Sequence, residues 1–151
     1  LTILEQIPVT GAILVTTPQR LAQVDAERGI ALFHDLDIPV FGVIENMSHY
    51  VCPCCGKQQP LFPNADVPAM AKRKHIRYLG ALPLDPQGQD LADSGRPMVV
   101  SYKDGPVATA FHDLADVVTD GLARERRQSL RDADPTTRAA HAAFWERLME
   151  E

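Results

Sequence analysis

The sequence predicts an α/β fold, the C-terminal part of a doubly wound parallel sheet. Three apolar, β-branched runs, at residues 11–17, 38–45 and 76–84, are typical of buried parallel strands. Amphipathic segments separate these runs and give the strand and helix alternation of a parallel sheet. Three strands make a thin sheet for this class, and the chain lacks an initiator Met, so we interpret it as a fragment whose further strands lie upstream.

The first complete helix is predicted from Pro18 to about Leu36. Thr17 is a candidate cap and Pro18 suits the first helical position. An apolar stripe to about Leu36 is expected from Leu21, Val24, Ala31 and Leu32. The remaining elements are expected, in order, as the end of a helix at 1–7, a helix at 67–74, a short helix or turn at 85–93, an extended stretch at 95–100 and a helix from Pro106 to Leu122.

The composition is that of one ordinary domain. The chain has 151 residues, of which 45% are hydrophobic, and a net charge of -5. An acidic balance argues against a nucleic-acid partner, and no apolar run reaches the roughly 20 residues of a membrane span. We assign residues 1–122 to the α/β domain and 123–151 to a charged linker and an amphipathic helix, which either docks on its own domain or binds a partner.

All three cysteines lie within the string SHYVCPCCGKQQ. Cys52 and Cys55 form a C-x-x-C motif with Cys54 between them. This odd, adjacent set does not suit a disulfide framework, so we expect a reducing compartment and thiols that act as ligands or redox groups. Zinc or a 4Fe-4S cluster takes about four ligands. Four equivalent thiolates arise most simply when two chains each give one C-x-x-C across a two-fold axis.

Other interpretations of the cysteine loop stay open. His49 precedes Cys52 by three residues and is a candidate third ligand of a zinc knuckle. A redox C-x-x-C is a second interpretation, although Pro53 and Gly56 favour a tight turn over the helix start that such motifs use. Reduced cysteines that bind nothing are the third.

Four strings follow one another in a recognisable order: IPVTGAILVTTPQRLAQVDAERGIALF, IPVFGVIENMSHYVCPCCG, LGALPLDP and DSGRPMVV. Together they resemble the Mrp (ApbC-like) family, P-loop ATPases of the MinD/ParA class that carry iron–sulfur clusters, over residues 1–122. The resemblance implies a homodimer that holds a labile 4Fe-4S cluster through Cys52 and Cys55 of both subunits and passes it to apo iron–sulfur proteins. Cys54 fills the variable position and is treated as an extra thiol.

The resemblance also implies that the intact protein binds ATP with Mg and hydrolyses it. The Walker A motif and the Walker B region are absent from these residues, so we expect the chain alone to be inactive as an ATPase. Asn46 is similar to the base-reading Asn of this class, and Pro83, Leu84 and Asp85 lie where relatives close over the adenine. Simpler roles are a turn residue for Asn46 and a helix N-cap for Asp85.

Two stretches depart from the family pattern. LFPNADVP replaces a Gly-rich segment after the cysteines, and KRKHIRY is unusually basic. Two other functions therefore remain: a zinc-stabilised binding module without a nucleotide or cluster role, and a degenerate homologue that regulates an intact subunit. The family occurs in bacteria, cytosol and organelles, so we expect a cytoplasmic location, or an organelle matrix.

Overall fold

The computed structural model of this chain describes residues 9–52, 54–63 and 66–132. The chain divides into two compact units, Leu1–Val117 and Val118–Glu151. The helix end predicted at 1–7 and the amphipathic helix predicted from about Pro135 lie outside the described residues. In chain order the elements are β1 (Ala12–Thr16), α2 (Arg20–Asp35), β2 (Val40–Glu45), β3 (His49–Val51), β4 (Gln58–Pro60), α3 (Val67–Arg73), β5 (Tyr78–Ala81), α4 (Gln87–Asp93), α5 (Met98–Ser101) and α6 (Pro106–Asp132).

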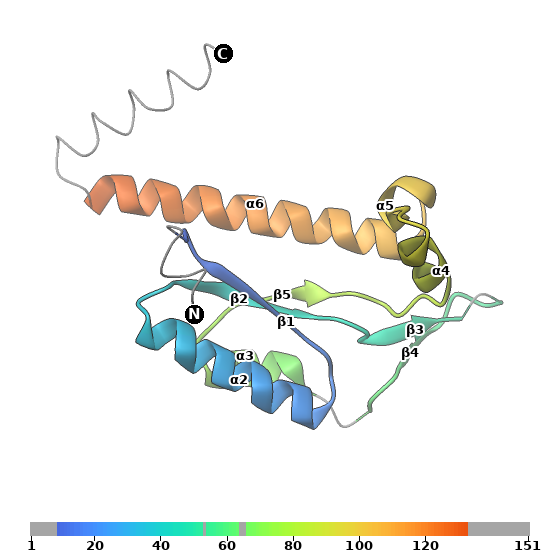
Figure 1. Cartoon of the computed structure of the whole chain (residues 1–151), viewed down its shortest axis with the longest axis horizontal. Coiled ribbons are helices and arrows are strands. Elements are labelled where there is room, and N and C mark those ends of the chain that lie inside the picture. The colour runs from blue at the N-terminus through green and yellow to red at the C-terminus, as the bar shows by residue number, and fades with distance from the viewer. Residues whose placement is uncertain (1–8, 53, 64–65, 133–151) are drawn as a thin grey trace, which may run out of the picture. The chain divides into compact units, whose positions relative to one another are not determined.

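The centre of the first unit is a parallel sheet with the strand order β1-β2-β5 (Figure 1). Thr16 at the end of β1 pairs with Glu45 at the end of β2, and Glu45 pairs in turn with Ala81 at the end of β5. The three predicted parallel strands and the α/β class are therefore confirmed. The predicted burial of residues 11–17 is wrong in part, because β1 lies at an edge of the described sheet and its Ile13 and Val15 side chains are exposed. The carboxyl ends of all three strands lie at one edge, where sheets of this kind bind ligands.

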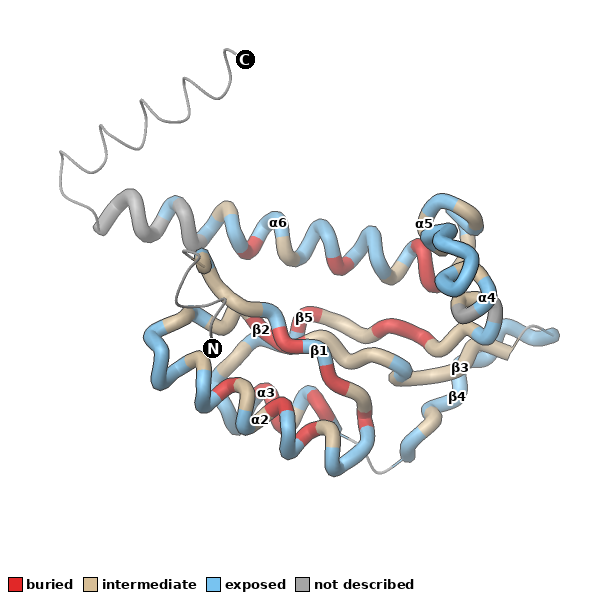
Figure 2. The backbone as a smooth tube through the Cα atoms, in the orientation of Figure 1, coloured by how far each residue is buried: buried red, intermediate tan, exposed pale blue. Residues whose placement is uncertain are grey.

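Helices α2 and α3 cover one face of this sheet (Figures 1 and 2). Leu14 and Val43 from the strands meet Ile30 from α2 and Val67 and Met70 from α3 in one buried cluster. Each such side chain contributes about 1.5–3 kcal/mol when it is fully buried. The strand faces that carry Leu14 and Val43 thus account for this layer, but the predicted apolar stripe of α2 is wrong. Its four members, Leu21, Val24, Ala31 and Leu32, are exposed, and the buried side of α2 consists of Gln23, Ala26 and Ile30.

The beginning of α6 covers the other face. Leu114 lies over Gly80, where an added Cβ would come within 2.8 Å of the Leu114 Cδ2 atom. Val107 and Ala108, one helical turn into α6, are also buried. Glycine at position 80 therefore lets the helix approach the strand closely.

Two local predictions are wrong. Residues 95–100 were expected to be extended, but Met98–Ser101 forms a short helix, because Pro97 has a φ of -60° and its carbonyl O accepts the N–H of Ser101. Thr17 does not cap α2. The cap is Gln19, and the Thr17 hydroxyl donates to the Gln19 side chain instead.

The last helix is longer than expected. It continues to Asp132, ten residues beyond the expected end at Leu122. Residues 123–132 are rich in Arg, with Ala, Glu, Gln and Leu, which are all good helix formers. Of the second unit, residues 118–132 are the described part, and they are helical. The domain boundary between residues 122 and 123 stays a prediction.

Candidate functional site

The three cysteines lie at the turn of a short antiparallel hairpin, β3 and β4, in which Tyr50 pairs with Gln59. The N–H of Cys52 donates to the carbonyl O of Lys57 over 3.0 Å, and the N–H of Gly56 donates to the carbonyl O of Cys52 over 2.8 Å. Gly56 has a φ of +68°, a conformation that favours glycine. From the sequence we expected a loop here rather than a hairpin, because a strand of three residues is too short to give a periodic pattern.

The Cys52 thiol is the least exposed of the three sulfur groups. It accepts hydrogen bonds from the backbone N–H of Cys54 and of Cys55, and it is hydrogen-bonded to the thiols of both. These bonds, the one from the Cys54 backbone foremost, lower the pKa of Cys52 from its ordinary value of 9.0. Cys52 is half-buried, whereas Cys54 and Cys55 are exposed. The turn thus favours a thiolate, the form that binds metal.

His49 is not brought to the cysteines. Its Nδ1 atom lies 2.7 Å from the hydroxyl Oγ of Ser48. His49 and Cys52 are also three positions apart along extended chain, which directs such side chains to opposite faces. Among the residues that the structure describes, no three His, Cys, Asp or Glu side chains are placed to hold one metal ion. The hairpin therefore offers a thiol pair from Cys52 and Cys55 rather than a closed knuckle with His49.

The hairpin is attached to the segment that follows β5. The Ser48 N–H and the Ser48 hydroxyl both donate to the carbonyl O of Leu82, each over 3.0 Å. Tyr50 forms a parallel bridge with Leu84. A hollow of about 430 Å³ lies between hairpin and segment, lined by Tyr50, Val51, Cys52, Gly56, Pro83, Leu84, Asp85, Pro86, Pro106 and Val107. Sequence reasoning missed Ser48 and Tyr50, since their roles depend on residues more than 30 positions away.

Asn46 lines a different hollow, of about 520 Å³, at the carboxyl ends of β1 and β2 together with Thr16, Thr17 and Asp25. Its N–H donates to the carbonyl O of Thr16, and its Oδ1 accepts the N–H of Met47 over 3.0 Å. Among the described residues, no hydrogen bond is seen for its side-chain amide Nδ2. The bond to Met47 is also what the turn-residue interpretation expects.

The structure thus places the predicted base-binding residues on neighbouring strand ends but in two hollows. Asn46 lines one, and Pro83, Leu84 and Asp85 line the other. Pro86, just before α4, has helical backbone angles (φ -60°, ψ -29°), and the carbonyl O of Asp85 accepts the N–H of Gly88. The alternative role of Asp85 as the helix cap stays a prediction. A nucleotide role for these four residues stays a prediction.

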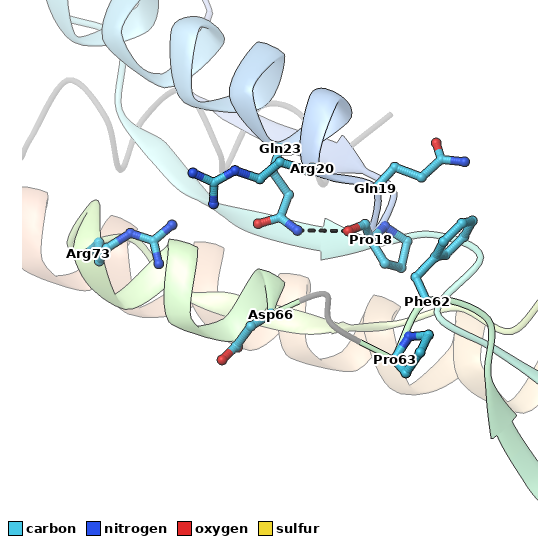
Figure 3. Close-up of a pocket in the computed structure, with 8 residues that line it drawn as sticks. All are labelled: Pro18, Gln19, Arg20, Gln23, Phe62, Pro63, Asp66 and Arg73. Atoms are coloured by element: carbon cyan, nitrogen blue, oxygen red, sulfur yellow. Dashed lines mark hydrogen bonds between the residues drawn. The ribbon is translucent and has the colours of Figure 1, made fainter.

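A third hollow, of about 310 Å³, lies at the start of α2 (Figure 3). The side chain of Gln23 is buried there, and its Nε2 donates to the carbonyl O of Pro18 over 2.8 Å. This bond fixes the entry of the chain into α2 in place of the expected Thr17 cap. None of the predicted site residues lines this hollow.

Within the described ranges, no helix has both the length and the apolar composition that a membrane crossing requires. A family model described as ParA, NUBPL iron-transfer P-loop NTPase, matches residues 1–119. The chain is 40% identical over 122 residues to an iron-sulfur cluster carrier protein of Salmonella typhimurium, a match that covers 81% of this chain and 33% of that protein. The chain thus spans about a third of the length of the curated relatives it matches.

Two solved structures are similar to the chain. One is a nucleotide-binding protein of Archaeoglobus fulgidus in complex with ADP, with a TM-score of 0.50 and 32% identity over 58% of this chain and 36% of that one. The other is the MinC:MinD cell division protein complex of Aquifex aeolicus, with a TM-score of 0.60 and 24% identity over 75% of this chain and 43% of that one. The second likeness concerns the fold alone, and it agrees with the MinD-like parallel sheet.

Proposed function

This chain belongs to the ParA family of NUBPL-type iron-transfer P-loop NTPases, and we propose that it forms part of an iron–sulfur cluster carrier. Its cargo is a 4Fe-4S cluster, held at a dimer interface by Cys52 and Cys55 of each subunit. The carrier delivers this cluster to apo iron–sulfur proteins. The resemblance of the sequence to Mrp-type carriers and the names of its relatives support this role.

The observation that carries the proposal is the paired thiols at the hairpin turn. Cys55 is exposed and Cys52 half-exposed, and the Cys52 sulfur accepts the N–H of Cys55. Thiolates are the usual ligands of such clusters, and four of them are needed. Two chains related by a two-fold axis supply four, with few bonds from each chain and with open access for a recipient protein.

A nucleotide site at the carboxyl edge of the sheet completes the proposal. Asn46 would read the base through its free Nδ2 group, and the Pro83–Asp85 segment would lie against the base. The match to a nucleotide-binding protein in complex with ADP supports nucleotide binding, and parallel sheets of this kind bind ligands at this edge. ATP and Mg would also need a phosphate-binding motif, which these 151 residues do not contain. The chain by itself should therefore show no sustained ATP hydrolysis.

Anaerobic reconstitution with iron and sulfide tests the carrier role. We expect about two iron and two sulfide per chain on a species with twice the mass of the chain. Cys52→Ser should abolish the loading and Cys55→Ser should lower it. Cys54→Ser, one residue away in the same turn, is the matched control and should load as the parent does.

The same experiment separates the carrier from its rivals. A colourless, air-stable zinc protein that stays monomeric and takes up no iron would replace the carrier with a zinc-stabilised binding module. Normal loading without dimerisation would refute the bridging arrangement alone. We place the carrier in the cytoplasm or an organelle matrix, which localisation of the tagged protein would test.

A further inference from the structure

The three thiols of the hairpin turn fall into one inner and two outer groups. Cys52 is half-buried and lines the hollow of about 430 Å³ between the hairpin and the segment after β5. Cys54 and Cys55 are both exposed, and neither lines that hollow. The inner thiol is thus backed by protein, whereas the two outer thiols face solvent and any approaching partner.

Both outer residues lie in the same closed turn as the inner thiol. The N–H of Gly56 donates to the carbonyl O of Cys52 over 2.8 Å, and the N–H of Cys52 donates to the carbonyl O of Lys57 over 3.0 Å, so Cys54 and Cys55 are held beside Cys52. Hydrogen bonds from Cys54 and Cys55 to the Cys52 thiol accompany this closure. The turn therefore holds two pairs of neighbouring sulfur atoms that share Cys52. One pair contains Cys55, the ligand already proposed, and the other contains Cys54.

We propose that Cys54 is an exchange ligand for the iron–sulfur cargo, which replaces Cys55 while Cys52 stays bound. This inference rests on the proposed function. In the exchange, the bond from one iron atom to the Cys55 sulfur breaks and a bond from that iron to the Cys54 sulfur forms. The thiol proton of Cys54 passes to the Cys55 thiolate, and no electrons are transferred.

An internal exchange of this kind eases release. A thiol held in the same turn competes for iron at an effective concentration far above that of a free thiol in solution. The chain therefore keeps two bonds to the cluster while one ligand is already leaving. A cluster that alternates between two outer thiols is easier for a recipient's thiolate to capture than one held by a fixed pair.

Four forms of the chain test this: the parent, Cys54→Ser, Cys55→Ser and the double variant Cys54→Ser/Cys55→Ser. Each is reconstituted anaerobically, assayed for iron and sulfide, then treated with iodoacetamide and mapped by mass spectrometry. In the loaded parent we expect label on Cys54 but little on Cys52 or Cys55. In Cys55→Ser we expect about half of the parent's iron, with Cys54 now protected from the label, because a two-thiolate grip remains. The double variant should be empty.

Transfer kinetics give a second readout. The loaded Cys54→Ser variant should pass its cluster to an apo 4Fe-4S ferredoxin about fivefold more slowly than the parent, at equal loading. Either of two results overturns the exchange: Cys55→Ser as empty as the double variant, or a loaded Cys55→Ser in which Cys54 is labelled as fast as in the parent. A parent that takes up no cluster would refute the proposed function as well, so the two failures are distinguishable.

Discussion

The backbone N–H of Leu84 donates to the carbonyl O of His49 over 2.8 Å, and this bond fixes the cysteine hairpin to the segment that follows β5. Tyr50, the next residue of β3, forms a parallel bridge with Leu84. The strand that leads to Cys52 pairs with β4 in a sheet of its own, and the bridge and the hydrogen bond attach it to the chain that follows β5. A change in the position of the Pro83–Asp85 segment must act directly on the turn that carries the thiols.

Replacing Ser48 with Ala should loosen this attachment. The hydroxyl of Ser48 donates to the carbonyl O of Leu82, and its loss should lower the free energy of unfolding by about 1 kcal/mol. Urea unfolding followed by circular dichroism measures this. Ser101→Ala is the control, because the described structure gives the half-buried Ser101 side chain no hydrogen bond, and it should change stability by less than about 0.5 kcal/mol. Equal midpoints for both variants would contradict the attachment.

The reactivity of Cys52 should depend on pH in a way that reflects its amide donors. In the variant Cys54→Ala/Cys55→Ala the backbone N–H groups remain, so the pKa of Cys52 should stay below 9.0. The rate of reaction with iodoacetamide, measured against pH, gives this pKa directly. A lowered pKa also stabilises the folded chain above pH 9.0, and this contribution is lost as the pH falls through the folded value. An inflection of the reaction rate at or above pH 9.0 would show that the amide donors do not lower the pKa of Cys52.

Tyr78 should titrate later than a free tyrosine. Its partial burial first, and then the bond from its hydroxyl to the carboxylate of Glu45 over 2.8 Å, raise its pKa above 10.0, although 37% of the residue is still exposed. A raised pKa stabilises the fold fully below pH 10.0, and the contribution is lost as the pH rises toward and through the folded value. Between about pH 9 and 11, the unfolding free energy should therefore fall more steeply in the parent than in Tyr78→Phe. If the unfolding free energies of the parent and of Tyr78→Phe changed with pH in the same way, the raised pKa of Tyr78 would be contradicted.

Gly42 should not tolerate a side chain. A Cβ at this position would lie 2.5 Å from the carbonyl O of Arg77, the residue just before β5. Because backbone on both sides must shift, Gly42→Ala should cost about 3 kcal/mol in thermal or urea unfolding. Gly95→Ala is the comparison: it has a φ of +67° but meets no atom within 4 Å, so about 1 kcal/mol is expected. A cost for Gly42→Ala no larger than that for Gly95→Ala would contradict the close strand packing.

The sequence by itself determined the parallel sheet, its first helices and the paired cysteines. Apolar runs such as 11–17 and 38–45 are local patterns, and they predict parallel strands without knowledge of the fold. Which side of α2 faces the sheet could not be read in this way, because the buried side carries the polar Gln23 beside Ala26 and Ile30. The C-x-x-C motif likewise needs no partner elsewhere in the chain to indicate a thiolate pair. These patterns can be recognised without the structure because each of them involves residues that are close together in the sequence.

Only the tertiary structure decided how the site is assembled. The hairpin that presents Cys52 depends on β4 and on hydrogen bonds to Leu82 and Leu84, which are more than 30 residues further along the chain than Ser48 and His49. Its strands have three residues each, which is too short for a periodic pattern in the sequence. The same is true of the separation of Asn46 from Pro83 into two hollows. Such pairings depend on which distant backbone groups find one another, and that choice is made by the packing of the whole sheet rather than by any local stretch.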